Sequence, residues 1–238
     1  MNMLKAVRYI GDRLQKYGVL ATLHDLQCRL VNTAAHFQIL RGMTVRMRNV
    51  RDPSLYEAPG FDARFLKEGE LWIYAQDPAH QISPEFLGVA LERGDRCYGL
   101  IDRRGGALAA YGWYSNLRTP LDEHFLLHFE RSWSYMYKGY TMPAYRGMRL
   151  HAIGMCRALR ELRHEGRKGL ISCVASNNHA SLQSVTRMGY RIFGSAYLLR
   201  VGERSYAHAT RGCKRYGFRV EPFAAPREPT AVRGFSKP

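Results

Sequence analysis

Two stretches near the N-terminus have the periodicity of amphipathic helices. In residues 4–16, and again after Gly18, apolar side chains recur at intervals of three and four residues. The apolar positions of the second stretch are Leu23, Leu26, Leu30, Ala34 and Phe37. The basic residues of the first stretch are Lys5, Arg8, Arg13 and Lys16. Such a basic helix could lie on an anionic membrane surface, but packing against the rest of the protein is commoner and is what we expect.

The next part of the chain predicts one strand and two helices. Apolar and polar side chains alternate over residues 43–50, which favours a short strand with one buried face. A proline-containing loop follows, and helices are then expected at 63–74 and 84–92. Ser83 is the expected N-cap of the second helix, with Pro84 at its first position.

Strand patterns dominate from residue 97 to residue 141. Residues 97–101 and 107–114 flank a glycine-containing turn at 102–106, which predicts a β-hairpin. Two further strands are expected at 125–129 and 133–141, and the second of these is rich in aromatic residues.

The following segment alternates helices with strands. Residues 149–163 have the pattern of an amphipathic helix, and 170–175 is the short apolar run expected of a strand in the middle of a sheet. Either Asn177 or Asn178 can cap the next helix, which Gly189 should end in a left-handed conformation.

A last strand at 190–201 completes a mixed α/β pattern, for which we expect a mostly antiparallel central sheet flanked by helices. The expected division is an N-terminal helical extension (1–42), one domain (43–221) and a loose, proline-containing C-terminal tail (222–238).

The composition is that of a folded protein and leaves the function open. Of 238 residues, 46% are hydrophobic and 24% are charged. The formal net charge of +16 would attract nucleotides, phosphorylated cofactors, acidic carrier proteins or anionic membranes without choosing among them. The five cysteines are widely spaced and form no metal-binding pattern, so we expect reduced thiols and no metal. No signal peptide or membrane-spanning run is apparent, and we expect a cytoplasmic protein.

The segment between Tyr140 and Leu150 has the pattern of a phosphate-binding turn. Residues 143–147 (PAYRG) place a proline and an Arg-Gly pair between a strand end and a helix. Such a turn directs free backbone N–H groups outward, and the positive end of the helix dipole adds to their attraction for phosphate oxygens.

This segment resembles the signature of the GNAT superfamily of acyl-CoA N-acyltransferases, in which [V/T]-x-P-x-[Y/F]-R-G-x-G-x-G joins a strand to a helix. The resemblance spans residues 97–201, and its specific part lies between 135 and 190. It implies that the turn binds the pyrophosphate of acetyl-CoA or a longer acyl-CoA. The residues it assigns to the cofactor are Tyr140, Thr141, Met142, Arg146, Gly147, Met148, Arg149, Leu150 and His151. Arg149 and His151 replace the last two glycines of the pattern, so either the backbone approaches the phosphates less closely or a side chain replaces an amide contact.

A second block resembles the superfamily's N-x-x-[A/S] helix that ends in G-[F/Y]. Counting back from Gly189 places Asn178 on the asparagine and Ser181 on the small residue, and both are assigned to the cofactor together with Ser184. Many members carry a tyrosine four residues before the glycine, which often protonates the leaving thiolate. That position is Val185 here, so Tyr140, Ser181, Ser184 or a water molecule would have to take the role.

The resemblance implies direct attack of a free amine on the thioester, without a covalent enzyme intermediate. A backbone N–H near Tyr140 or Thr141 would polarise the carbonyl. The catalytic candidates are Glu130 as base, with Tyr140 and Ser181; other candidate bases are Asp122, Glu123, His124 and His128. Alternation places Trp133, Tyr135 and Tyr137 on one face of their strand. Tyr135 and Tyr137 could line the acceptor or acyl pocket there, or they could pack in the core.

The expected function is transfer of an acetyl or longer acyl group from acyl-CoA to a small amine, such as an amino acid or a biosynthetic intermediate. Two related alternatives are an enzyme that takes the acyl group from an acyl carrier protein and a non-catalytic protein that keeps the CoA site. A basic nucleic-acid-binding module is the least favoured, because neither a helix-turn-helix nor an RNP signature is present.

Overall fold

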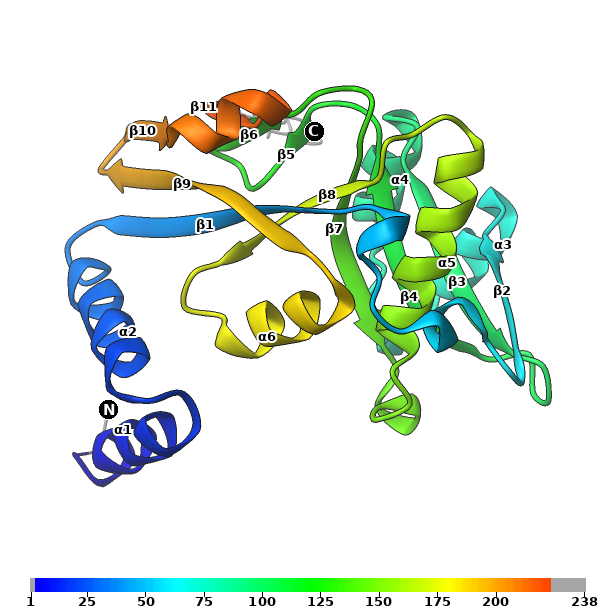
Figure 1. Cartoon of the computed structure of the whole chain (residues 1–238), viewed down its shortest axis with the longest axis horizontal. Coiled ribbons are helices and arrows are strands. Elements are labelled where there is room, and N and C mark those ends of the chain that lie inside the picture. The colour runs from blue at the N-terminus through cyan, green and yellow to red at the C-terminus, as the bar shows by residue number, and fades with distance from the viewer. Residues whose placement is uncertain (1–2, 224–238) are drawn as a thin grey trace, which may run out of the picture.

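The computed structural model describes residues 3–223, which form two β-sheets and six α-helices (Figure 1). The larger sheet has the order β10-β9-β1-β8-β7-β4-β3-β2, and all its neighbouring strands are antiparallel except β7 and β8. Its strands are β1 (His36–Val45), β2 (Phe61–Phe65), β3 (Arg96–Asp102), β4 (Leu108–Ser115), β7 (Ser134–Thr141), β8 (Leu170–Ala175), β9 (Arg191–Val201) and β10 (Arg204–Ala209). The smaller sheet contains β11 (Arg219–Pro222), β6 (Phe125–His128) and β5 (Thr119–Pro120), in that order. The predicted mixed, mostly antiparallel architecture is confirmed.

Helices and the smaller sheet cover both faces of the larger sheet. The helices are α1 (Met3–Tyr17), α2 (Val19–Val31), α3 (Glu68–Ala75), α4 (Pro84–Glu92), α5 (Leu150–His164) and α6 (His179–Met188). On β4, Ala110 and Tyr114 pack toward α5, whereas Tyr111 and Trp113 pack toward α3 and α4. Alternate side chains of one strand therefore enter two separate cores, one on each face of the sheet.

Several predicted elements are confirmed together with their caps. Helix α4 begins at Pro84, and the Ser83 hydroxyl accepts a hydrogen bond from the Phe86 amide (3.2 Å). Strand β8 lies in the middle of the sheet, between β1 and β7. Asn178 caps α6, which ends at Gly189 with φ of 109°. Capping signals of this kind therefore predict where these two helices begin and where α6 ends.

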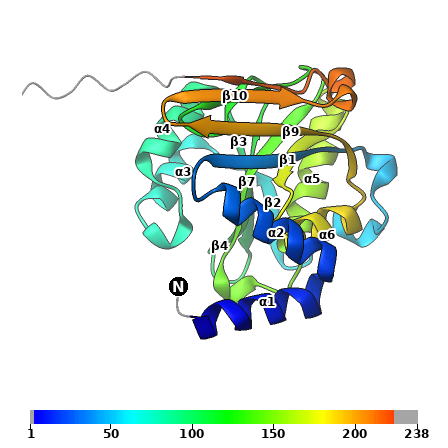
Figure 2. The same cartoon turned by 90° about the vertical axis from the view of Figure 1, so that its left-hand side faces the viewer.

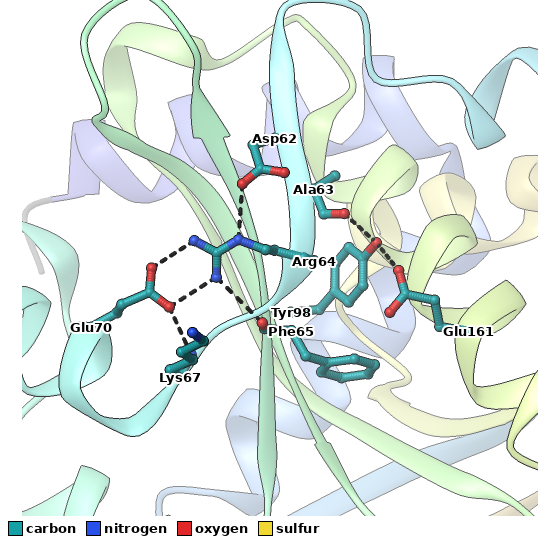
Figure 3. A network of polar contacts seen from close by, with 8 residues as sticks. All are labelled: Asp62, Ala63, Arg64, Phe65, Lys67, Glu70, Tyr98 and Glu161. Atoms are coloured by element: carbon teal, nitrogen blue, oxygen red, sulfur yellow. Dashed lines mark hydrogen bonds and ion pairs between the residues drawn. The ribbon is translucent and has the colours of Figure 1, made fainter.

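The helix predicted at 63–74 is wrong over its first part. Residues 61–65 form β2, which pairs with β3, and α3 begins only at Glu68. Figure 3 shows what fixes this change of direction: Arg64 donates to both oxygens of Glu70 (2.8 and 2.7 Å), and Glu70 also accepts from the Lys67 amide (2.9 Å). The carboxylate of Glu70 therefore caps the first turn of α3 while it holds the end of the strand.

The N-terminal predictions also need correction. Helix α2 ends at Val31, and Phe37, which was expected to lie on this helix, belongs to β1. The strand predicted at 43–50 therefore begins earlier, at His36. Pairing with both β8 and β9 extends β1 across residue 42. The division into extension, domain and tail stays a prediction. The α2 stripe expected to pack inward is largely exposed, with Leu23 and Leu30 51% and 72% exposed. The predicted tail lies outside the described residues from residue 224 onward.

Candidate cofactor and acceptor site

Strands β7 and β8 are paired only where they begin. Ser134 lies opposite Leu170 and Tyr135 opposite Ile171, and the Ser172 hydroxyl then donates to the Met136 carbonyl (2.8 Å). Beyond this point the two strands diverge, as Figure 1 shows, while β4 and β1 remain paired to their outer edges. The facing edges of β7 and β8 therefore border a widening gap in the centre of the sheet.

The hydrogen bonds of β7 determine which of its amides face this gap. The Met142 amide donates to the Ala109 carbonyl of the β4 segment (2.9 Å). Because N–H directions alternate along a strand, the Tyr140 amide also points toward β4, and those of Thr141 and Gly139 point into the gap. The oxyanion donor expected near Tyr140 or Thr141 is thus better placed at Thr141, and the Met142 amide is already occupied.

The turn after β7 presents a run of amides without acceptors. It begins with a short 3₁₀ turn (Pro143–Tyr145), and Gly147 follows with φ of 87°. The first backbone bond of α5 runs from the Ile153 amide to the Arg149 carbonyl (3.0 Å). Within the described residues, none of the six amides from Gly147 to Ala152 has an acceptor. They lie at the positive end of a 15-residue helix, where anions bind well.

Arg149 adopts the conformation that a glycine would take at this position. Its φ of 59° is left-handed and unusual for a residue with a side chain. Its guanidinium donates to Asp52 (2.7 Å), whose pKa falls to about 2, first because of the Ser54 hydroxyl and then because of Arg149. Arg149 is therefore already paired, whereas Arg146 has no ion pair within the described part of the chain.

His151 replaces the last glycine of the family pattern and packs against β7. A Cβ added to Gly139 would lie 2.2 Å from His151 Cε1, so a larger residue at position 139 would require this ring to shift. Burial lowers the pKa of His151, which is consequently neutral at pH 7. The side chain of Leu150 is buried in the core and that of Met148 is half exposed. These two residues can therefore offer a ligand at this turn mainly their amides.

The predicted groups of α6 lie on the α5 side of the sheet. The side-chain oxygen of Asn178 accepts from the Ser181 amide (3.1 Å), and it therefore acts as a helix cap. Val185 packs into the core shared with α5, and it cannot donate a proton. Ser181 is half-buried and Ser184 is exposed, so both hydroxyls remain accessible on this side.

The three catalytic candidates do not come together. Tyr140 packs with Tyr111 in the core below α3 and α4, on the face of the sheet opposite Ser181. Glu130 precedes β7 at the closed end of the gap, whereas Tyr140 lies near the other end of this strand. The strand between Ser134 and Tyr140 spans about 20 Å, which separates the two residues. Glu130 also accepts from Lys168 (2.6 Å), which lowers its pKa. A carboxylate held in this way is a weak base.

A β-bulge turns two consecutive side chains of β7 to the face opposite α5. Met136 pairs with Tyr114 and Lys138 with Trp113, which leaves Tyr137 as the extra residue. Tyr137 donates to the buried Asp95 (2.8 Å), and Arg93 binds the same carboxylate. Burial and the neighbouring carboxylate raise the pKa of Tyr137, so its hydroxyl stays protonated.

Tyr135 and Trp133 are packing residues. Both are at most 3% exposed and belong to the core between the two sheets. The ring of Tyr135 stacks on Tyr137, and its hydroxyl lies 3.2 Å from the sulfur of Cys173 on β8. Of the two predicted substrate residues, only Tyr137 is partly accessible.

Lys138 lies in a cleft that the sequence did not indicate as a site. The cleft has a volume of about 320 Å³ and is lined by the end of α3, the start of α4 and the segment between them. The ammonium of Lys138 lies 3.9 Å from the centre of the Phe86 ring, and burial lowers its pKa. It has no anionic partner among residues 3–223. The signal that could have found it is a lysine within a strand whose other residues are mostly apolar or aromatic.

The described residues contain no cluster of His, Cys, Asp and Glu side chains that could hold a metal ion. All five cysteines are free. In residues 3–223, no helix combines the length and the apolar character required to cross a bilayer.

No protein-family model and no curated protein matches the chain. Among solved structures, it is similar to a GNAT-family acetyltransferase from Colwellia psychrerythraea (14% identity, TM-score 0.47, covering 74% of this chain and 61% of that one). It is also similar to a tandem GNAT protein from the clavulanic acid biosynthesis pathway (17% identity, TM-score 0.46, covering 83% of this chain and 58% of that one). A third similar structure is a GCN5-related N-acetyltransferase from Kribbella flavida (12% identity, TM-score 0.44, covering 73% of this chain and 62% of that one). The chain spans less than two thirds of the length of each.

Proposed function

We propose that the protein is an acyl-CoA-dependent N-acyltransferase that acylates a small amine. One observation carries the proposal: the amides of residues 147–152 lack acceptors at the N-terminus of α5, where the unpaired edge of β7 ends. Clustered amides at a helix N-terminus bind phosphate oxygens, and a free strand edge binds an extended amide-containing chain. Coenzyme A combines a pyrophosphate with such a chain, so these residues fit it.

In this proposal the turn holds the pyrophosphate, and Arg146 is the cation beside it. The N–H groups of Thr141 and Gly139 are donors for the extended arm of the cofactor and for the carbonyl oxygen of its acyl group. When bound, the cofactor supplies an acyl group activated as a thioester. Asn178 and Ser181 are proposed contacts from α6.

The proton for the departing sulfur has to come from a group other than residue 185. Val185 has no donor, and the Tyr140 hydroxyl lies on the other face of the sheet. The remaining donors are Ser181, Ser184 and water. Ser181 is favoured because it is half-buried, whereas Ser184 is exposed. Replacing Ser181 with alanine should then lower kcat more than it weakens CoA binding.

The amine is proposed to approach from the face that carries Tyr137 and Lys138. An unpaired ammonium in a partly apolar cleft is costly to bury and favours an anionic ligand group. We therefore propose an acceptor with a carboxylate near its amine, as in an amino acid. Lys138→Met should raise KM for such an acceptor about tenfold, the usual loss for one exposed or half-buried charge contact, and leave KM for the decarboxylated amine unchanged.

Two measurements test the proposal. Isothermal titration with CoA examines the turn, and thiol release from acetyl-CoA and longer acyl-CoAs with a panel of amines examines the chemistry. CoA binding without turnover against any amine would favour a non-catalytic CoA-binding protein, for which the valine at position 185 is the supporting observation. Absence of CoA binding would refute both functions.

A further inference from the structure

Helix α2 has its polar and apolar faces reversed relative to an ordinary surface helix. The side chains that it buries, at intervals of three residues, are Thr22, Asp25 and Cys28. The leucines on its other side are exposed, Leu20 by 84% and Leu30 by 72%. A surface helix normally turns its apolar stripe toward the core. Here Leu20, Leu23 and Leu30 are exposed, and only Leu26 is half-buried.

Buried polar contacts hold α2 in this orientation. The carboxylate of Asp25 is 2% exposed and contacts Arg13 of α1 and His179 of α6 (3.2 Å). Arg13 also donates to the Asn177 carbonyl (3.2 Å), and the His24 ring bonds the Ser176 hydroxyl (2.8 Å). Turning the leucines inward would break the contacts of Asp25 with Arg13 and His179. These buried contacts favour the observed orientation of the helix.

Both N-terminal helices carry exposed apolar side chains. We call this set the leucine face, and it consists of Val7, Leu14, Val19, Leu20, Leu23, Leu30 and Val31. Figures 1 and 2 show α1 and α2 at one end of the molecule, beyond α6. Exposed apolar surfaces of this extent mark a contact with another molecule or with a membrane.

The exposed charged side chains of these two helices are mainly positive. Arg8, Lys16 and Arg29 are exposed, and none of them has an acidic partner in the described residues. Asp12 is the one exposed acidic residue of the two helices. Two copies joined through this face would bring these positive charges together, which disfavours a symmetric dimer. A partner surface that is both apolar and negatively charged would complement the exposed leucines and valines as well as the positive charges.

We propose that the leucine face docks on the surface of an anionic lipid bilayer, with the two helices lying in the interface. Leucine and valine side chains would enter the boundary between head groups and acyl chains, and the arginine and lysine side chains would contact anionic head groups. This inference does not depend on the proposed enzymatic function. It also revises the expectation from the sequence that these helices bury their apolar faces against the domain.

Vesicle flotation tests the proposal directly. The full chain should bind vesicles of phosphatidylcholine with phosphatidylglycerol, and bind more weakly to phosphatidylcholine alone or at high salt. The double variant Leu20→Ser/Leu30→Ser should lose about tenfold or more in partitioning for each leucine removed. The matched control is Ile73→Ser, which removes a 70% exposed side chain of α3 and should leave vesicle binding unchanged.

Three results would overturn the proposal. The first is absence of binding to the anionic vesicles, and the second is an equal loss of binding in the Ile73→Ser control. The third is a stable dimer in sedimentation velocity that the double variant dissociates, which would identify a second copy of the chain as the occupant. Because the substituted leucines are exposed, melting temperatures close to that of the parent should confirm that the variant is folded.

Discussion

Two glycines at the two ends of α5 allow the proposed phosphate-binding turn to be tested against a matched control. Gly147 precedes the helix with φ of 87°, and Gly166 follows it with φ of 89°. Both are exposed, and a Cβ at either position would meet no atom within 4 Å. Valine at either position should therefore introduce the same backbone strain without a clash, about 1–2 kcal/mol for a left-handed residue.

The two variants should differ only in CoA binding. Both should melt a few degrees lower than the parent, by about 2–8 °C for this strain in a chain of this size. Gly147→Val should also reorient amides of the turn. Losing one hydrogen bond to a charged phosphate costs about 1.5–3 kcal/mol, which raises the Kd for CoA about 10- to 100-fold. Gly166→Val should bind CoA as the parent does.

Isothermal titration with CoA and a thermal melt of each variant give the required data. Unchanged CoA affinity in a folded Gly147→Val protein would show that the turn is not the site. An equal loss in both variants would show that the effect comes from helix stability and not from the amides. Either result would refute the reasoning.

Three further predictions concern the fold and the chemistry. Gly189→Ala should destabilise the protein by about 2–4 kcal/mol in urea denaturation, because the new Cβ would lie 1.8 Å from the Asn49 carbonyl oxygen at a φ of 109°. The Arg64 guanidinium lowers the pKa of Glu70 to about 2, so this carboxylate stabilises the fold above its unfolded pKa and less as pH falls toward 2. Glu70→Gln should remove about 1 kcal/mol at neutral pH and flatten the stability profile between these values. Burial raises the pKa of Cys156 to about 12, so acyl-CoA alone should leave no acyl group on this thiol in mass spectrometry.

The parts of the fold that the sequence predicts well are those with local signals. The α4 and α6 helices carry a capping side chain at their first turn, and α6 ends at a glycine in the left-handed conformation. The turn at Gly147 is likewise specified by residues that are adjacent in the chain. Each of these signals acts within a few residues, so no knowledge of tertiary contacts is needed to interpret it.

The misassigned elements depend on partners that are distant in the sequence. Residues 61–65 become a strand through pairing with β3, although the residues after them are good helix formers. Residues 36–45 take their length from β8 and β9, which lie more than a hundred residues later. The orientation of α2 is also set from a distance, by the contact between Asp25 and His179. Periodicity predicts that a helix has an apolar face but not what that face contacts.

The organisation of β7 explains why the sequence indicates the proposed cofactor groups but not the proposed acceptor groups. Regular alternation in the part of β7 after the bulge directs the Thr141 and Gly139 amides into the gap, and the motif marks this strand end. The bulge at Tyr137 interrupts the alternation, so the side chains of Tyr137 and Lys138 lie on the same face of the sheet. A bulge arises from the fit of two strands, and neither strand specifies it alone. In the proposed function the cofactor and acceptor groups are consequently separated across a single strand, and variants of Lys138 should alter acceptor selection without altering CoA binding.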